Sequence, residues 1–323
     1  MHRFELARAT TTTQARDLAE EKKGSVFKAG GIDLIDHLKE HLIEPPRVVD
    51  IKSIPGLDGV SVEKDGSLRI GTLATLARVS SHPEVKKRWP ALAQACGEAA
   101  SPQIRNVATI GGNILQRPRC WYYRLESYKC IKKGGDTCFA IAGENRYHVI
   151  FGGGPAFPPH PSNAAVPLVA YGASFVVEGA QGTRTVAADD FFVLPEKDPT
   201  RENVLAPGEV LREIRVPATK GRQSAYLEVR ERAAFDWPLA AVAVVVESGA
   251  GTVKSARVVL GAVAPIPWRS KKAEEALVGK PLGASSAEAA AMAATLGAVP
   301  MTDNGYKVDL VKTLVSRVVT SLA

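Results

Sequence analysis

Residues 26–42, VFKAGGIDLIDHLKEHL, place two glycines between a short apolar run and an amphipathic segment. The apolar residues before the glycines predict a short buried strand that ends in a glycine turn. After the turn, Ile32, Ile35, Leu38 and Leu42 recur at the spacing of one helical face. The segment therefore predicts a strand, a glycine turn and a helix in immediate succession, as in folds that mix strands and helices.

The following residues continue this mixture. Residues 48–54 predict a strand, and residues 60–72 predict a hairpin because Asp65-Gly66 is a turn signal between two short β-runs. Residues 72–100 predict helices with an interruption at His82-Pro83. No internal repeat occurs, which argues against a solenoid or a propeller.

The second half of the chain predicts a separate unit. Residues 165–173 predict a buried helix and residues 174–178 a strand, and the polar segment 196–209 then contains two prolines, as domain linkers often do. Beyond it come four strand-like runs and three helices, at 270–278, 284–298 and 306–322. We expect the alanine-rich helix 284–298 to pack closely on the sheet.

Size and charge set further limits. The 323 residues are 45% hydrophobic, which suits two domains. The longest apolar run, residues 239–246, is too short to cross a bilayer. The N-terminal residues lack an apolar signal region and a twin arginine, so we expect a cytoplasmic protein, or a periplasmic one only by export with a signal-bearing partner. The 41 basic and 34 acidic residues are interspersed and no nucleic-acid motif occurs, so we expect no nucleic-acid partner.

A second glycine pair lies in TIGGN, residues 109–113. Paired glycines allow a ligand close to the backbone, and N–H groups at a turn or helix start bind phosphate oxygens. Neither pair fits the P-loop or the G-x-G-x-x-G pattern. A functional interpretation requires that both pairs converge on the two phosphates of one dinucleotide.

Three of the four cysteines, Cys120, Cys130 and Cys138, follow a C-x9-C-x7-C pattern in a basic, aromatic segment. They could form disulfides, bind zinc, bind an iron–sulfur cluster or be incidental. The missing secretion signal argues against disulfides, and the missing C-x2-C pairs argue against zinc. Nearby basic side chains would offset the negative charge of a cluster, so the sequence favours an iron–sulfur site.

The motifs AGGIDL, SPQIRNVATIGGN and HPSN, in this order, resemble the FAD-binding subunit or domain of the xanthine dehydrogenase family of molybdenum hydroxylases. The resemblance covers essentially the whole chain. It implies an α+β fold: a vanillyl-alcohol-oxidase-type FAD-binding domain in residues 1–200, with subdomains 1–55 and 56–200. A smaller α/β C-terminal domain of the carbon monoxide dehydrogenase flavoprotein type would follow in residues 210–323.

The resemblance also implies site residues. The cofactor-binding residues would be Phe27, Lys28, Ala29, Gly30, Gly31, Ile32, Asp33, Leu34, Asn106, Thr109, Ile110, Gly111, Gly112, Asn113, Ser162, Asn163 and Leu211. Glu228 falls where relatives also approach the flavin. Asn163 stands where many relatives have an aspartate. The resemblance implies no catalytic residue in this chain.

The cysteine segment resembles an insertion, residues 116–160, that binds a [4Fe-4S] cluster in aldehyde oxidoreductases and 4-hydroxybenzoyl-CoA reductases. Cys120, Cys130 and Cys138 would be ligands, whereas Ala156 stands where relatives commonly have the fourth cysteine. The site would hold a [4Fe-4S] cluster with another ligand (His148, His160 or Asp136), hold a degraded cluster, or be lost. Cys96, in a predicted helix, is expected to be a buried structural thiol.

The function implied is that of an electron-transfer flavoprotein subunit. A molybdopterin-containing large subunit would oxidise an aldehyde or heterocycle, and electrons would pass through the [2Fe-2S] clusters of a small subunit to FAD here and on to an external acceptor. One alternative is a self-sufficient flavin oxidase or reductase with the same FAD domain. Another is a scaffold protein without a cofactor.

Overall fold

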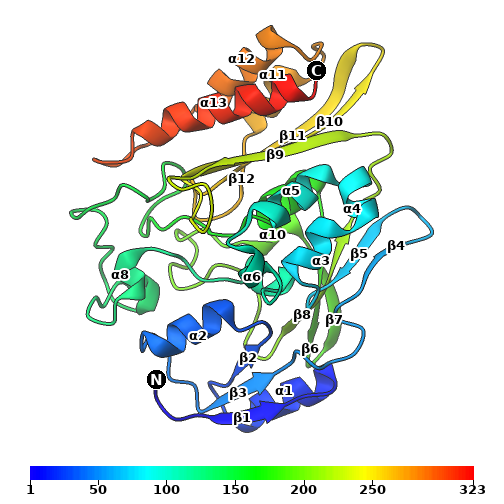
Figure 1. The fold of residues 1–323 in the computed structure, drawn as a ribbon. Helices are drawn as coiled ribbons and strands as arrows, with labels where there is room; N and C mark the ends of the chain where they lie inside the picture. The colour runs from blue at the N-terminus through cyan, green and yellow to red at the C-terminus, as the bar shows by residue number, and fades with distance from the viewer.

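The computed structural model describes all residues from Met1 to Ala323 and contains three sheets. The first part holds a parallel three-stranded sheet, ordered β1-β3-β2, with one helix after each of its first two strands (Figure 1). Its elements are β1 (Glu5–Arg8), α1 (Thr12–Glu21), β2 (Val26–Lys28), α2 (Ile32–Lys39) and β3 (Arg47–Asp50). The predicted strand, glycine turn and helix at residues 26–42 are therefore confirmed.

The middle part is built on a five-stranded antiparallel sheet, ordered β4-β5-β8-β6-β7. Its strands are β4 (Val60–Val62), β5 (Leu68–Gly71), β6 (Ser174–Gly179), β7 (Gly182–Ala187) and β8 (Val210–Val216). The helices are α3 (Leu76–Ser81), α4 (Pro83–Arg88), α5 (Pro90–Glu98), α6 (Pro102–Arg105), α7 (Ile110–Ile114), α9 (Ala165–Tyr171) and α10 (Ala188–Phe191). The largest apolar core of the molecule lies between them, and Cys96 is fully buried within it, as expected.

The last part consists of a four-stranded antiparallel sheet covered by three helices. Its elements are β9 (Gln223–Val229), β10 (Ala240–Gly249), β11 (Thr252–Gly261), β12 (Trp268–Arg269), α11 (Lys271–Leu277), α12 (Ala284–Ala294) and α13 (Tyr306–Ser321). The expectation that the alanine-rich helix lies on the sheet is wrong: α12 packs mainly against α11 and α13, and these two helices contact β11 and β10. The small alanine side chains allow close packing between helices instead.

The change from the middle sheet to the last sheet lies later than the sequence suggests. The predicted C-terminal domain starts at residue 210, but β8 is hydrogen-bonded between β5 and β6. The last sheet begins with β9 at Gln223. The strand pattern of residues 210–216 could not reveal which sheet it joins, because an apolar strand suits the interior of either one.

The insertion, residues 116–160, is mostly irregular and contains only α8 (Trp121–Arg124) and the short 3₁₀ helix η1 (Ile131–Lys133). Figure 1 shows α8 beside α2, at the left of the view and between the first part at the bottom and the last part at the top. The last part also fixes the end of the insertion, because the Asn304 amide donates to the carbonyls of His148 (3.0 Å) and Val149 (3.1 Å). No helix of the structure has the length and apolar character of a membrane span.

Candidate functional site

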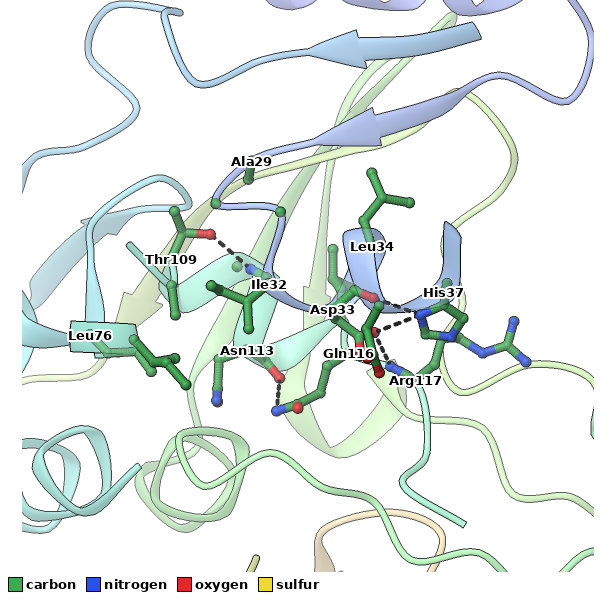
Figure 2. Close-up of a pocket in the computed structure, with 18 of the residues that line it drawn as sticks. Ala29, Ile32, Asp33, Leu34, His37, Leu76, Thr109, Asn113, Gln116 and Arg117 are labelled. Carbon is green, nitrogen blue, oxygen red and sulfur yellow. Dashed lines mark hydrogen bonds and ion pairs between the residues drawn. The ribbon is translucent and has the colours of Figure 1, made fainter. Parts of the chain in front are cut away.

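Both glycine loops line one cavity of about 720 Å³ (Figure 2). This volume lies within the range of cofactor and ligand sites in proteins. Most of the residues predicted to bind the cofactor line it: Phe27, Ala29, Gly30, Gly31, Ile32, Asp33, Leu34, Thr109, Gly111, Gly112, Asn113, Asn163 and Leu211. Two segments that are about 80 residues apart in the sequence thus converge on the same space, as one dinucleotide would require.

Four predicted residues do not line the cavity. Lys28 instead pairs with Asp50 at 3.0 Å, and Ile110 is completely buried in the core. Asn106 is exposed at the end of α6, where its backbone N–H donates to the carbonyls of Ile104 and Pro102. Ser162 acts indirectly, because its hydroxyl donates to Asn113 Oδ1 at 2.7 Å and holds that side chain in place.

Two of the glycines are required by the packing of the chain itself. A Cβ atom on Gly30 would overlap the Val107 carbonyl oxygen and lie 3.3 Å from Ala108 Cα. A Cβ atom on Gly111 would overlap Thr72 Oγ1. These positions let the loops approach each other and β5, whether or not a ligand is present.

The loops differ in the hydrogen-bond donors that they leave for a ligand. In the second loop, the N–H groups of Ile110 and Gly111 donate to the carbonyls of Ala74 (2.8 Å) and Thr72 (2.9 Å). The Gly112 N–H donates to Thr109 Oγ1 at 3.1 Å, the cap of α7.

In the first loop, by contrast, the N–H groups of Ala29, Gly30 and Gly31 donate to no group of the chain. The first-turn N–H groups of α2, which follow directly, have no partner within the helix by geometry. These consecutive free donors fit an anionic group such as a pyrophosphate.

Asp33 does not face the cavity as a free anion. Its carboxylate pairs with Arg119 (3.0 Å) and Arg124 (2.8 Å) and accepts the Arg117 backbone N–H at 2.9 Å. Burial alone would raise the pKa of this carboxyl, but the charges of Arg119 and Arg124 outweigh it and lower the pKa below 3.8. The first turn of α2 thus anchors the start of the insertion, and Figure 2 shows one of these contacts, between Asp33 and Arg117.

Part of the cavity wall was not predicted from the sequence. Phe235, Asp236 and Trp237, from the loop between β9 and β10, line it. Phe235 is 65% exposed, and its φ of 56° is rare for an aromatic residue. The Arg119 guanidinium lies 4.4 Å from the centre of the Trp237 ring, a cation–π contact that joins this loop to the insertion. Nothing in the local sequence pattern signals that these residues reach the glycine loops.

A second cavity, of about 330 Å³, adjoins the first and shares Arg119, Asp236 and Trp237 with it. Cys120 and His148 line this second cavity. The cysteine segment therefore lies next to the glycine-loop cavity, separated from it by the Arg119–Trp237 pair.

The three cysteines of the insertion are free thiols that lie near one another. The pKa of the Cys120 thiol is raised to about 12, mainly by burial. The N–H groups of Tyr123 and Tyr122 oppose this rise, and the nearby Cys138 and Cys130 thiols add to it. Burial also raises the pKa of Cys138, whose sulfur accepts N–H groups from Phe157 and Ala140. Converging sulfurs that accept backbone N–H groups are typical of iron–sulfur sites.

These residues do not form a site for a single ion, since no three His, Cys, Asp or Glu side chains come close enough to hold one. Of the three substitutes considered for the fourth cluster ligand, only His148 contacts a cysteine in the structure: its Nε2 lies 3.2 Å from Cys120 Sγ. His160 instead accepts the Ser162 N–H, and Asp136 accepts the Thr137 hydroxyl. Ala156 is fully buried directly before Phe157, whose N–H reaches Cys138. The possible donors of this segment are therefore three thiols, with the His148 imidazole beside one of them.

Comparison with known proteins agrees with this geometry. Residues 2–219 match the family described as "FAD binding domain in molybdopterin dehydrogenase", and residues 224–322 match "CO dehydrogenase flavoprotein C-terminal domain". The boundary between the matches coincides with the gap between β8 and β9.

Individual relatives match along nearly the whole chain. The aldehyde oxidoreductase FAD-binding subunit PaoB of Escherichia coli is 33% identical over 97% of this chain and 96% of its own length. The carbon monoxide dehydrogenase medium chain of Hydrogenophaga pseudoflava is 32% identical over 85% of this chain and 79% of its own length. A carbon monoxide dehydrogenase structure from the same organism superposes with a TM-score of 0.78 at 30% identity, over 98% of this chain and 96% of that one. The chain therefore belongs to the family of FAD-binding subunits of the multi-subunit molybdenum hydroxylases, which are oxidoreductases.

Proposed function

We propose that this chain receives electrons from two partner subunits and passes them to an external acceptor. A molybdopterin-containing large subunit would oxidise the substrate, and the [2Fe-2S] clusters of a small subunit would deliver the electrons to FAD bound here. Aldehydes are the first substrate class to test, because the relative with 33% identity is named an aldehyde oxidoreductase subunit. Xanthine dehydrogenase subunits are also among the relatives, at 25% identity, which makes purines the second class.

The observation that carries this proposal is the convergence of both glycine loops on one cavity. FAD, when bound, accepts electrons singly and delivers them in pairs. The free N–H groups of residues 29–31 and of the first turn of α2 would hold its pyrophosphate. Thr109 and Asn113 would form the facing wall, while Trp237 and Phe235 would cover the cavity from the last part of the chain and limit the access of water.

The decisive experiment begins with the purified chain and its absorption spectrum. We expect bound FAD and little oxidation of aldehydes or purines by the isolated chain. Adding the large and small subunits should give a stable complex in which an aldehyde reduces the FAD of this chain. Strong aldehyde oxidation by the isolated chain would favour the self-sufficient oxidase, and a chain that binds no FAD would contradict both.

We further propose that Cys120, Cys130 and Cys138 hold an iron–sulfur cluster, with His148 as the nearest additional side chain. The buried thiols, the N–H groups that point at their sulfurs and the adjoining cavity support this assignment. Iron and sulfide analysis with EPR on anaerobically prepared protein tests it. We expect about three to four irons per chain, removed by Cys130→Ser. Flavin without iron, in protein whose three thiols all react as free cysteines, would contradict the cluster.

A further inference from the structure

The side chain of Asn163 connects the cofactor cavity to a buried acidic group. Asn163 precedes α9, is only 5% exposed and lines the cavity. Its Nδ2 donates to Glu228 Oε2 at 2.6 Å and lies 3.5 Å from the Tyr226 hydroxyl. Glu228 and Tyr226 are two residues apart on β9, so they share one face of that strand. The contact therefore joins the last part of the chain to the wall of the cavity.

The carboxyl group of Glu228 is buried and is surrounded by hydrogen-bond donors and a positive charge. Its Oε2 also accepts the Tyr226 hydroxyl, and its Oε1 lies 3.4 Å from Arg230 Nε. The Glu228 side chain is only 2% exposed, and Arg230 in turn pairs with Glu98 at 2.6 Å. Burial raises the pKa of Glu228, whereas the donors from Tyr226 and Asn163 and the charge of Arg230 oppose this rise.

This arrangement fixes which way the Asn163 amide points. A carboxylate accepts hydrogen bonds and cannot donate them, so the Asn163 amide must turn its nitrogen toward Glu228. Its Oδ1 then has no hydrogen-bond partner within the chain and is left for a ligand in the cavity. Glu228 does not line the cavity, so it acts on a ligand only through Asn163.

We propose that Glu228 is a positioning residue, which holds Asn163 Oδ1 in the cavity as an acceptor for a hydroxyl or ring N–H of FAD. The inference rests on the proposed function, because FAD is the ligand. It explains why an amide suits position 163: a carboxylate there would face the Glu228 carboxylate at hydrogen-bond distance, and two such charges cannot both ionise without a cost. It also predicts that exchanging the two functional groups restores the contact, since an amide at position 228 can donate to a carboxylate at position 163.

The test is an exchange experiment on the full chain, with FAD affinity measured by fluorescence quenching. Asn163→Asp should weaken FAD binding about tenfold or more at pH 8, because two carboxylates then meet. The double variant Asn163→Asp/Glu228→Gln should recover most of that loss, because the amide introduced at position 228 then donates to the carboxylate introduced at position 163. Glu98→Gln, which removes an exposed charge from the same arginine, is the control and should bind FAD like the unmodified chain.

The absorption spectrum of bound FAD gives a second readout. It should change in Asn163→Asp and return in the double variant, which a change in stability alone would not produce. If Asn163→Asp unfolds, Glu228→Leu serves in its place: it leaves the amide free to turn and should also weaken FAD binding. Equal affinity in Asn163→Asp and the unmodified chain, or a double variant no better than the single one, would overturn this inference alone. An unmodified chain that binds no FAD would overturn it together with the proposed function.

Discussion

Gly30 packs directly against the backbone of Val107, so that a Cβ atom at position 30 would overlap the Val107 carbonyl oxygen. The two glycine loops are therefore in contact without a ligand between them. A substitution at Gly30 or Gly111 would disturb the chain itself, and a loss of cofactor in such a variant would not identify a binding site. A glycine whose Cβ meets less of the chain is needed to test the cavity.

Gly112 is such a glycine. It lies within α7 and lines the cavity, and a Cβ atom there would meet only Thr109 Oγ1, at 3.0 Å. We expect Gly112→Ala to fold and to bind FAD about tenfold more weakly, because the methyl group occupies cavity space and presses on the Thr109 cap. FAD titration monitored by fluorescence measures this.

Gly97→Ala is the matched control for Gly112→Ala. Gly97 lies in α5, outside the cavity, and its Cβ would make an ordinary contact with Ser80 Cβ at 3.7 Å. FAD affinity should not change in this variant, and the helix should gain up to about 1 kcal/mol. Equal FAD affinities in Gly112→Ala and Gly97→Ala would show that α7 does not face the cofactor.

Asp33→Asn tests the anchor between α2 and the insertion. The substitution leaves Arg119 and Arg124 without their buried counter-charge, so we expect a loss of about 3 kcal/mol in the free energy of unfolding. Asp36→Asn is the control: Asp36 pairs with the same two arginines, but its side chain is 42% exposed, so the loss should be less than half as large. Urea unfolding followed by circular dichroism measures both.

The effect of Asp33→Asn should also depend on pH. The pKa of Asp33 is lowered in the folded chain, so its contribution is fully present above the unfolded value of 3.8. The difference between Asp33→Asn and the unmodified chain should therefore shrink as the pH falls through the lowered folded pKa. A difference that stays constant across this range would mean that the carboxylate charge is not what stabilises the contact.

Lys307 gives a prediction of the same sign, stability that rises with pH, but in the neutral to alkaline range. Its Nζ donates to the carbonyls of Tyr147 (3.0 Å) and Ala262 (2.9 Å), and the residue is only 1% exposed. Burial lowers the pKa of Lys307 from 10.5 to about 7. Between these values the unfolded chain holds the proton more tightly than the folded chain, so the free energy of unfolding should rise with pH from about 7 to 10.

Lys307→Met isolates this effect, because methionine fills similar space and does not titrate. The free energy of unfolding of the unmodified chain, minus that of Lys307→Met, should increase by up to about 1.4 kcal/mol for each pH unit above 7. Chemical unfolding at several pH values between about 6 and 10 measures the slope. A flat difference would show that the Lys307 amine keeps its ordinary pKa in the folded chain.

The regular elements follow closely from the sequence, because apolar periodicity and turn residues act locally. The helix at Ile32–Lys39 and the hairpin around Asp65-Gly66 formed where the pattern predicted them. The sheet partner of β8 was not predictable in this way, since it depends on which distant strands are available. The contact of α12 with α11 and α13 likewise results from tertiary packing.

The cavity shows the same division between local and distant information. The glycine loops could be predicted because a glycine pair is a local signal in the sequence. The other residues expected to bind the cofactor came from the resemblance to a known family. Phe235 and Trp237 carry no such signal, because they reach the cavity only through the placement of β9 and β10. The Asn163–Glu228 contact also joins segments that are far apart in the chain. Such contacts depend on how the parts of the chain pack together, which periodicity does not encode.

The last prediction concerns the missing fourth cysteine. Ala156 is fully buried, and the next residue, Phe157, donates its N–H to the sulfur of Cys138. A thiol at position 156 would therefore lie near Cys138. We expect Ala156→Cys to raise the iron content to about four per chain and to make the cluster more stable in air, because a fourth thiolate completes the usual ligand set.

The variants around Ala156 separate a cluster site from a structural remnant. Ala156→Ser has nearly the same size as Ala156→Cys but supplies no thiolate, so it should leave the iron content as in the unmodified chain. His148→Ala removes the side chain nearest to Cys120 and should lower iron retention in the unmodified chain, while Ala156→Cys should compensate for this loss because the added thiolate replaces the lost donor. Iron analysis and EPR on anaerobic samples measure these changes. If Ala156→Cys and the unmodified chain both lack iron while FAD is fully bound, the three thiols have no cluster to hold, and Arg119 and Trp237 then only close the flavin cavity.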